Sequence, residues 1–368
     1  MAPSIRTAEN SNGSRTGPVL VTGAFGLVGT ATVRRLLDTG REVVATDLDN
    51  PRNRRVARGI ADTRLRVHWA DLTDPEQVDE LITTVAPTDV VHLAAIIPPL
   101  CYRYPDLAEA VNVGATAALV RAAEKSPAPP RFVQASSVAV YGPRNPHRTD
   151  AVLAPDTPIR PIDVYGTQKG EAERLLTTSA LEWIVLRLGG VLSVSGGLAI
   201  NTDMLRFEAA LPADGRIQTV DVRDVAAAFE SALTTPATRE VFLIAGDSSH
   251  RQRQHDVVSS VTAALGLRDV FPDGIVGDPD NDEHWFTTDW VDTERSQQVL
   301  AFQQHSWPGM LEEIRVKAGR YRPLLRAAAP LARAWLRRTS PYLGKHRTFA
   351  DPWNAVTTMF GNPYPESA

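Results

Sequence analysis

The chain has 368 residues, of which 43% are hydrophobic and 22% are charged, and its formal net charge at pH 7 is −4. This composition excludes a disordered or fibrous protein and allows one or two domains with a sizeable core. The single cysteine, Cys101, excludes a disulfide bond within the chain. Residues 1–17 are polar and lack the apolar run of a signal peptide, so we expect a flexible leader on a cytoplasmic protein.

Short apolar runs alternate with helical patterns along the first half of the chain. Strands are predicted at residues 18–22, 42–46, 65–69, 89–93, 131–135 and 183–188, and helices at 27–39, 75–84, 107–125 and 164–178. This alternation is typical of a parallel sheet covered by helices. After Arg187 the elements become shorter and are broken by Gly and Pro, which predicts a smaller C-terminal part assembled on the first.

The segment "VTGAFGLVG" follows the first predicted strand and opens the first predicted helix. Its glycines, Gly23, Gly26 and Gly29, have the spacing of a dinucleotide-binding turn. Glycine lets the chain turn tightly and approach a pyrophosphate, whose charge the helix N-terminus stabilises. The segment therefore predicts a dinucleotide site.

Asp47 ends the second predicted strand, about twenty residues further on. A carboxylate at this place accepts hydrogen bonds from the adenosine ribose hydroxyls and repels a 2′-phosphate, which favours NAD over NADP. Three arginines close by in the sequence keep NADP open as the less favoured cofactor: Arg52, Arg54 and Arg55.

The segment "YGTQK" places Tyr165 and Lys169 four residues apart, and so on one face of a predicted helix. A phenol with an ordinary pKa near 10 needs a nearby cation before it can exchange protons at neutral pH, and Lys169 would supply that cation. Such a pair is most often an inert part of a solvated helix face, but it gains weight downstream of a nucleotide-binding segment.

Together these motifs resemble the short-chain dehydrogenase/reductase superfamily, and within it the extended, epimerase/dehydratase-like branch. The resemblance covers roughly Val19 to Phe229. It rests on motifs in the family's order: "TGAFGLVG", Asp47, "ADL" at 70–72, "HLAA" at 92–95, "NVGAT" at 112–116, "SSVAVYG" at 136–142 and "YGTQK" at 165–169.

The resemblance implies roles for the cofactor-binding residues. Asp71 and Leu72 would contact the adenine, Asn112 would hold the helix beside the active site, and Lys169 would bind the nicotinamide ribose. The full set of cofactor-binding residues implied is Gly23, Phe25, Gly26, Leu27, Gly29, Asp47, Asp71, Leu72, Ala94, Ala95, Asn112, Tyr165 and Lys169.

The resemblance also implies the catalytic residues Ser137, Tyr165 and Lys169. Ser137 would bind the substrate oxygen that Tyr165 protonates or deprotonates, and Lys169 would lower the pKa of Tyr165. Ser136 is expected to be structural. Tyr141 is expected to pack near the substrate mouth, although its hydroxyl could still touch substrate.

The residues at positions 138 and 139 indicate which reactions of this family the chain can catalyse. Val138 and Ala139 stand where sugar-nucleotide dehydratases and related decarboxylases carry acids, which argues against both reactions. A dehydrogenase and a 4-epimerase remain. The epimerase pattern has Arg and Asp where this chain has Ile217 and Gln218, and its Arg helps to hold the substrate diphosphate. Arg216 and Arg223 are near enough in the sequence to serve instead.

The loop after the fourth predicted strand, "AAIIPPLCYRYP", is apolar and rich in proline. It is either a packed loop or one wall of a pocket for an apolar carbonyl or alcohol. The residues expected at the substrate are Ile96, Ile97, Pro98, Ser137 and Tyr141. His92 is expected in the core or beside the cofactor, and no cluster has metal-ligand spacing, so we predict no metal.

Residues 314–350 contain ten Lys or Arg and no Asp or Glu. Six apolar residues are expected on one helical face, with an interruption or kink at Pro330: Leu324, Leu325, Ala328, Leu331, Trp335 and Leu336. The helix would dock on the enzyme or on another subunit, or would lie on a membrane surface. Its arginines recur too often for a membrane span, and no nucleic-acid recognition module accompanies the charge.

We therefore predict an α/β fold, a Rossmann-type doubly wound parallel sheet with a smaller C-terminal substrate-binding part. The expected divisions are a leader at 1–17, an NAD-binding domain at 18–190, a substrate-binding part at 191–313 that shares a strand and a helix with the core, and a basic extension at 314–368. The predicted protein is a homodimeric NAD-dependent oxidoreductase of a small molecule. Alternatives are an NAD-retaining nucleotide-sugar 4-epimerase and a non-catalytic NAD-sensing or scaffold protein.

Overall fold

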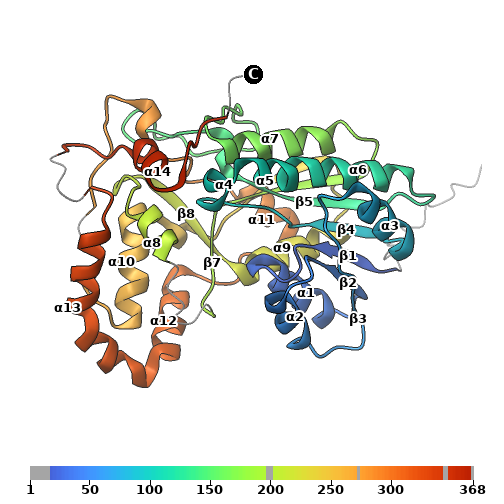
Figure 1. The fold of residues 1–368 in the computed structure, drawn as a ribbon, viewed down its shortest axis with the longest axis horizontal. Helices are drawn as coiled ribbons and strands as arrows, with labels where there is room; N and C mark the ends of the chain where they lie inside the picture. Colours follow the sequence, from blue (N-terminus) through green and yellow to red (C-terminus); the bar gives the residue numbers. More distant parts are fainter. Residues whose placement is uncertain (1–16, 196–201, 272–273, 343–346, 366–368) are drawn as a thin grey trace, which may run out of the picture.

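A seven-stranded parallel sheet forms the centre of the computed structural model, which describes residues 17–195, 202–271, 274–342 and 347–365 (Figure 1). The strand order is β3-β2-β1-β4-β5-β6-β9. Its strands are β1 (Val19–Thr22), β2 (Val43–Thr46), β3 (Leu65–Val67), β4 (Asp89–His92), β5 (Arg131–Ser137), β6 (Trp183–Leu188) and β9 (Glu240–Ile244). The order reverses direction at β1, as in a doubly wound sheet, and the predicted fold class is confirmed.

Helices cover both faces of this sheet (Figure 1). One face carries α3 (Pro75–Val85), α6 (Ala115–Lys125) and α7 (Val164–Thr177), and the other carries α1 (Leu27–Asp38), α9 (Val222–Thr234) and α11 (Glu294–Leu300). Successive side chains of β1 point to opposite faces of the sheet, so the strand contributes to the hydrophobic core on each face. Val19 and Val21 pack toward α1 and α9, whereas Leu20 packs toward α3 and α6. The strand is buried on both faces and therefore reads as a continuous apolar run.

A second, three-stranded sheet lies in the C-terminal part, with the order β10-β8-β7. Its strands are β7 (Gly190–Leu192), β8 (Arg216–Asp221) and β10 (Arg251–Arg253). The helices of this part are α8 (Thr202–Glu208), α10 (Gln254–Leu265), α12 (Trp307–Ala318), α13 (Arg322–Thr339) and α14 (Pro352–Phe360). The chain returns from β8 through α9 and β9 to the large sheet, so the two parts share a core.

Several local features differ from the predicted elements. Helix α2 (Pro51–Arg58) was not expected, although Asn50 caps it by accepting a hydrogen bond from the Asn53 backbone. The helix expected at 107–125 is divided into α5 (Pro105–Glu109), a π-helical turn (Ala110–Gly114) and α6. Strand β5 continues to Ser137, two residues beyond the predicted end.

The basic extension also differs from its prediction. Pro330 does not interrupt α13, because Pro330 and Arg326 are both exposed and water can reach the carbonyl that loses its partner. The prediction that all six apolar residues share one helical face is also wrong. Leu325 and Leu336 pack inward, whereas Leu324 and Leu331 face outward. The predicted leader at 1–17 lies, except for Gly17, outside the described residues.

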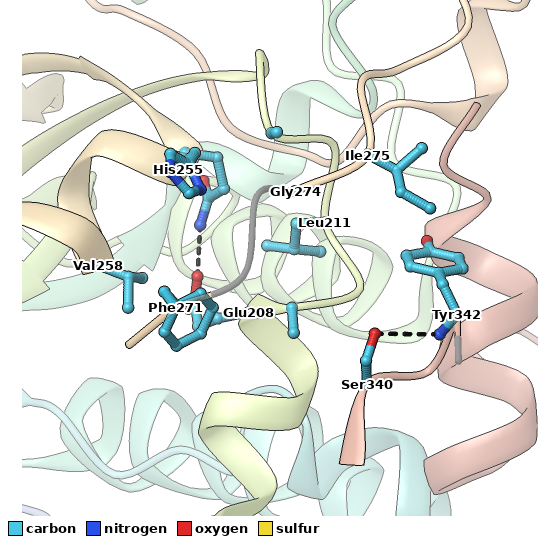
Figure 2. A pocket seen from close by; sticks show the side chains of 12 residues that line it. Glu208, Leu211, His255, Val258, Phe271, Gly274, Ile275, Ser340 and Tyr342 are labelled. Atoms are coloured by element: carbon cyan, nitrogen blue, oxygen red, sulfur yellow. Dashed lines mark hydrogen bonds between the residues drawn. The ribbon is translucent and has the colours of Figure 1, made fainter. Parts of the chain in front are cut away.

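A cavity of about 180 Å³ separates α8, α10 and the segment that follows α13 (Figure 2). Glu208 faces it, and its carboxylate accepts a hydrogen bond from the Gln254 side chain. Burial raises the pKa of Glu208 to about 7, and the bond from Gln254 opposes this shift. Tyr342 closes the other side, where its hydroxyl donates to the carbonyl oxygen of Ala210 over 2.6 Å.

We expect Glu208→Gln to stabilise the protein at alkaline pH. The folded-state pKa is about 7 and the ordinary value is 4.5, so the folded state binds more protons between these values and its stability falls as pH rises through them. The neutral amide avoids this loss, and its gain at about pH 8 should be on the order of 1–2 kcal/mol. Thermal unfolding at about pH 4.5 and pH 8 measures the difference.

The matched control is Glu312→Gln, whose side chain is exposed and paired with Arg315 on the surface. This control should not change the pH dependence of unfolding. An equal effect of Glu208→Gln at both pH values would contradict the raised pKa.

Candidate active site

The glycine-rich loop at 23–29 is packed too tightly for side chains at two of its glycines. Gly23 has a φ of +61°, and a Cβ there would lie 2.7 Å from the backbone nitrogen of Ala94. A Cβ on Gly29 would lie 2.1 Å from the carbonyl oxygen of Gly23. Gly26 precedes α1 and provides no side-chain cap, so the N–H groups of the first turn are left for a ligand or water. The loop thus fits a pyrophosphate.

Asp47 lies beside this loop at the carboxyl end of β2. Its carboxylate accepts hydrogen bonds from the backbone N–H groups of Phe25 over 3.0 Å and Leu48 over 2.9 Å. Asp47 therefore fixes the loop and still has oxygen lone pairs for a ribose. Asp71 lies near the end of β3, where its carboxylate accepts bonds from the backbone and hydroxyl of Thr73, and Leu72 next to it is buried.

Three predicted residues meet at the end of β5 and the start of α7. Ser137 is the last residue of β5, and its Oγ accepts a hydrogen bond from the backbone of Ala139 over 3.2 Å. Tyr165 lies in the first turn of α7, where the side chain of Ser137 hydrogen-bonds to it. Lys169 follows one turn later, with its Nζ 6.0 Å from the centre of the Tyr165 ring. The structure therefore brings the predicted catalytic set together.

The ionisation of this set differs from the expectation. Burial raises the pKa of Tyr165, and the hydrogen bond with Ser137 only partly opposes this effect. Burial lowers the pKa of Lys169 to about 8, while the charge of Glu173 acts to raise it. Lys169 donates to the carbonyl oxygen of Ala135 over 3.1 Å. The pKa of Tyr165 is therefore raised in the protein by itself, and its lowering by Lys169 stays a prediction.

The N-terminus of α7, which positions Tyr165, is fixed by residues that the sequence did not single out. Asp163 caps the helix by accepting from the backbone of Gly166 over 3.3 Å, and it also accepts from the Tyr102 hydroxyl over 2.8 Å. Burial raises the pKa of Asp163 to about 6. The backbone of Val164 donates to the carbonyl oxygen of Pro363 over 2.7 Å, so the C-terminal segment also fixes this turn.

Asn112 positions the loop that follows β4. Its side chain accepts from the backbone of Ile96 over 2.8 Å and donates to the Ile96 carbonyl over 2.9 Å and to Gln168 over 2.8 Å. Asn112 is fully buried and its donors are used, so the predicted direct contact with cofactor is wrong. It holds helix α7 beside the loop, which is the other role expected of it.

A buried ion pair lies behind the catalytic set. Arg187 of β6 donates to Glu173 of α7 over 2.9 Å and 2.7 Å, and Ser136 donates to the same carboxylate over 2.5 Å. Tyr141 belongs to this network, because its hydroxyl accepts from Arg187 over 2.6 Å and donates to the Ala154 carbonyl over 2.9 Å. Tyr141 is 4% exposed, so its predicted substrate contact is wrong and its packing role holds.

Apolar side chains from distant segments surround Tyr165. This cluster is formed by Ile96, Cys101, Tyr102, Ala108, Ile162, Met204, Phe207, Leu211, Phe286, Trp353, Val356, Met359 and Phe360. Ile96 comes from the predicted apolar loop and joins the cluster, whereas Ile97 is 51% exposed. Helix α14 contributes Trp353 and Phe360, and its position beside α4 (Leu100–Arg103) and α7 is visible in Figure 1.

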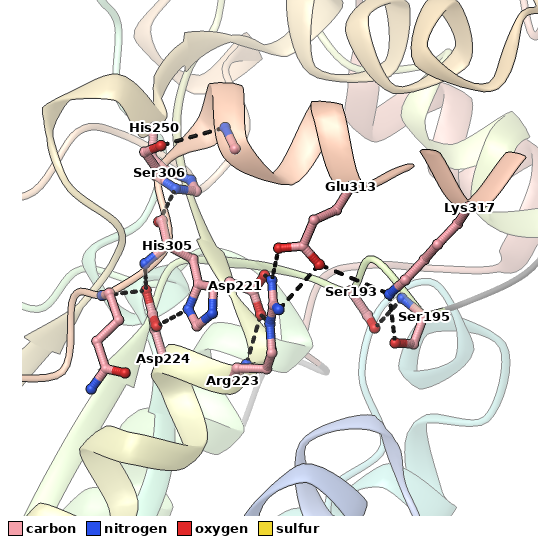
Figure 3. A network of polar contacts seen from close by, with 12 residues as sticks. Ser193, Ser195, Asp221, Arg223, Asp224, His250, His305, Ser306, Glu313 and Lys317 are labelled. Carbon is pink, nitrogen blue, oxygen red and sulfur yellow. Dashed lines mark hydrogen bonds and ion pairs between the residues drawn. The ribbon is translucent and has the colours of Figure 1, made fainter. Parts of the chain in front are cut away.

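A polar network lies between α9 and α12 and joins them (Figure 3). Arg223 lies at its centre and pairs with Asp221 over 2.6 Å and with Glu313 over 2.9 Å. Burial acts to raise the pKa of Asp221, but the bonds from Arg223 keep it below its ordinary value. Asp224 accepts from the His305 ring over 2.5 Å. Arg223 was expected to be near enough to replace the arginine of the epimerase pattern, but it is already paired with two carboxylates.

Arg216 is also engaged. It is 5% exposed, donates to Asp150 over 3.1 Å, and lies over the Trp290 ring at 4.8 Å. A cavity of about 630 Å³ extends from the glycine-rich loop to the network of Figure 3, with Phe25, Gly26, Leu27, Arg34, Arg52, Ser193, Arg223 and His305 among its lining residues.

His92 has both ring nitrogens occupied, by Thr22 over 2.7 Å and by Thr116 over 3.0 Å. Burial lowers its pKa to about 3, and this neutral histidine belongs to the core, as predicted. No helix in the described parts of the chain is long and apolar enough to cross a membrane.

Comparison with known proteins agrees with this geometry. The model of the "NAD dependent epimerase/dehydratase family" matches residues 19–245 and confirms the predicted resemblance. D-erythronate dehydrogenase of Cupriavidus necator is 34% identical over 170 residues, which are 43% of this chain and 49% of the relative. UDP-glucose 4-epimerase of Mycoplasma genitalium is 26% identical over 202 residues, which are 51% of this chain and 57% of the relative. The chain spans about half the length of these curated relatives.

Solved structures match more of the chain. MoeE5 in complex with UDP-glucuronic acid and NAD is 26% identical with a TM-score of 0.64, over 83% of this chain and 99% of that one. The Bordetella bronchiseptica enzyme WbmG in complex with NAD is 21% identical with a TM-score of 0.66, over 86% of this chain and 98% of that one. The likeness to WbmG shows a shared fold.

We expect Glu173→Gln to destabilise the protein strongly. The substitution leaves the Arg187 charge without its counterion at a place where both side chains are 5% exposed. Loss of one partner of a buried pair costs about 3–5 kcal/mol of unfolding free energy. Denaturant unfolding measures this loss.

The control lies on the same helix. Glu171 pairs with Arg174 on the surface, where the side chains are 39% and 59% exposed, and Glu171→Gln should change stability by no more than about 0.5 kcal/mol. Similar losses in the two variants would contradict the importance assigned to the buried pair.

Proposed function

Because the chain belongs to the NAD-dependent epimerase/dehydratase family, we propose that it is an oxidoreductase that transfers hydride reversibly between NAD and an alcohol or ketone carbon of a small, apolar substrate. The observation that supports this most is the meeting of Ser137, Tyr165 and Lys169 inside an apolar cluster. A phenol, a hydroxyl and an ammonium at one place suit proton exchange with a substrate oxygen.

The cofactor fits the residues at the carboxyl edge of the sheet. The tight glycine-rich loop and the uncapped start of α1 would hold the pyrophosphate, and Asp47 would accept from the adenosine ribose. Asp71 and Leu72 would lie at the adenine, and Ala94 and Ala95 along the nucleotide. NAD, favoured over NADP by Asp47, would supply the nicotinamide carbon that gives or accepts hydride when bound.

Tyr165 would exchange the proton with the substrate oxygen. Its raised pKa keeps the phenol protonated at neutral pH, so the resting side chain is ready to give a proton to a carbonyl oxygen. In the opposite direction, the phenolate of Tyr165 would take the hydroxyl proton of an alcohol. Ser137 would orient the same oxygen, and the Lys169 ammonium would favour the phenolate.

The apolar cluster supports a substrate without a large charged group. Ile96, Phe207 and Phe286 pack around Tyr165, and the exposed Ile97 and the half-buried Pro98 beside them would form the mouth. A charged substrate group could bind Arg216 or Arg223 only by displacing the carboxylates that already pair with them.

A nucleotide-sugar 4-epimerase is the second candidate. It is favoured by the 26% identity to MoeE5, whose structure contains UDP-glucuronic acid and NAD. The engagement of Arg216 and Arg223 disfavours it, because a diphosphate would have to displace Asp150 or Glu313 from them.

We expect Tyr165→Phe to abolish turnover while NAD binding is retained. The variant keeps the ring in its apolar cluster and removes only the proton-exchanging oxygen, so the rate should fall by about 10²–10⁴-fold. Turnover is measured by NADH absorbance with a panel of small ketones and alcohols that includes D-erythronate, and NAD affinity by calorimetry.

Tyr104→Phe is the matched control, because Tyr104 is 51% exposed and its loss should leave both quantities unchanged. Near-normal turnover of Tyr165→Phe would refute the assignment of the acid/base.

The two candidate reactions differ in the fate of the cofactor. We expect the purified protein to produce a net change in NADH with an alcohol or ketone, since a dehydrogenase releases its reduced cofactor. An epimerase returns the hydride to the same sugar, so conversion of a UDP-sugar without a net NADH change would overturn the first proposal in favour of the second.

A further inference from the structure

The cavity of about 180 Å³ between α8, α10 and the segment after α13 contains one carboxylate (Figure 2). Glu208, the last residue of α8, and His255 of α10 lie on one side of it, and Tyr342 lies on the other. No Lys or Arg is among the described residues that line it. The larger apolar side chains of the lining are Leu211, Val258, Phe271 and Ile275.

Glu208 has no positively charged partner in the described parts of the chain. Its carboxylate accepts a hydrogen bond from the neutral Gln254 side chain, and burial raises its pKa to about 7. A carboxylate can accept about four hydrogen bonds, so positions remain for a donor inside the cavity. A buried carboxylate without a counter-charge is unfavourable, and a cation in the cavity would stabilise its ionised form.

The size and the walls of the cavity indicate an organic cation. An apolar protein cavity of about 150 Å³ binds one benzene molecule, so this slightly larger cavity has room for a six-membered ring and one small group. A metal ion fits less well, because the described residues contain no group of three or more His, Cys, Asp or Glu that could hold one. An anion would meet the Glu208 carboxylate and no lysine or arginine.

We propose that this cavity binds a small organic amine. Its ammonium group donates to the Glu208 carboxylate, and its apolar body packs against Leu211, Val258 and Phe271. Leu211 also belongs to the apolar cluster around Tyr165, so the two regions are neighbours. None of the residues expected to bind NAD or substrate lines the cavity, which is therefore a second site. The proposal does not depend on the proposed chemistry.

The experiment is calorimetric titration of the full chain at pH 8 with three probes of similar size. Benzylamine carries the ammonium, benzyl alcohol has the same ring without a charge, and benzoate has the opposite charge. Benzylamine should bind with a Kd between about 10 μM and 1 mM, as suits a ligand of this size. Benzyl alcohol should bind at least about tenfold more weakly, and benzoate should not bind measurably.

The affinity for benzylamine should rise about tenfold from pH 6 to pH 8. Glu208 must be ionised to bind the ammonium, and its pKa is about 7. The other titratable side chains of the lining are His255 on α10 and Tyr342 after α13. Protonation of His255 would add positive charge and act in the same direction. The Tyr342 hydroxyl stays protonated, because burial raises its pKa above the ordinary value.

Two substitutions test the cavity itself. Glu208→Gln keeps the shape of the side chain and should weaken benzylamine binding at pH 8 by about tenfold or more, with most of the pH dependence lost. This substitution is expected to stabilise the fold at pH 8, so a loss of binding would not reflect unfolding. Val258→Phe keeps the carboxylate and should also weaken binding, because the larger side chain fills the cavity.

Matched controls separate this cavity from the surface and from the candidate active site. Glu312→Gln makes the same change of charge at an exposed position of α12 and should bind benzylamine like the unchanged protein. Tyr165→Phe should also bind benzylamine normally, and saturating NAD should not displace it, since neither change reaches the lining of the cavity.

Four results would overturn the proposal. The unchanged protein might show no benzylamine binding at pH 8, or Glu208→Gln might bind it equally well. Benzyl alcohol might bind as tightly as benzylamine, in which case the carboxylate would have no part in recognition. Displacement of benzylamine by NAD, or its loss in Tyr165→Phe, would place the amine at the candidate active site instead.

Discussion

The buried ion pair between Arg187 and Glu173 is the constraint on which the candidate active site depends. It joins β6 to α7, and through Ser136 it also joins β5, so both elements that supply the catalytic set are tied to one charge pair. Such a pair gives little net stability, because the desolvation of two charges offsets their attraction. Its contribution is geometric: with two bonds from a planar guanidinium, α7 cannot slide along the sheet without breaking them.

The Glu173 carboxylate of this ion pair also affects the pKa of Lys169. Lys169 is buried one turn before Glu173 on α7, and the Glu173 charge partly compensates the desolvation that lowers the lysine pKa to about 8. Lys169 therefore stays charged at neutral pH and donates to the Ala135 carbonyl, and no carboxylate among the described residues forms an ion pair with it. A carboxylate touching Lys169 would neutralise the cation that Tyr165 needs. Because Glu173 pairs with Arg187 instead, the charge of Lys169 remains available at the site.

The sequence predicts this part of the molecule well because its signals are local. The glycine spacing, Asp47 at a strand end, and the four-residue step from Tyr165 to Lys169 each follow from backbone geometry within one supersecondary unit. The contacts of Tyr102 with Asp163 and of Pro363 with Val164 could not be predicted in this way, because they join residues about 60 and 200 positions apart. Only the cap at Asp163 had a local signal, an acid three residues before Gly166.

The C-terminal extension therefore has two ends with different tasks. Helix α14 packs on the cluster around Tyr165, and the Pro363 carbonyl accepts from the first turn of α7, so this end is part of the candidate site. Helix α13 precedes it in the chain and presents apolar side chains on both of its sides. Its inner side, with Leu325 and Leu336, completes a core, and the packing of the described residues does not require leucine at 324 or 331.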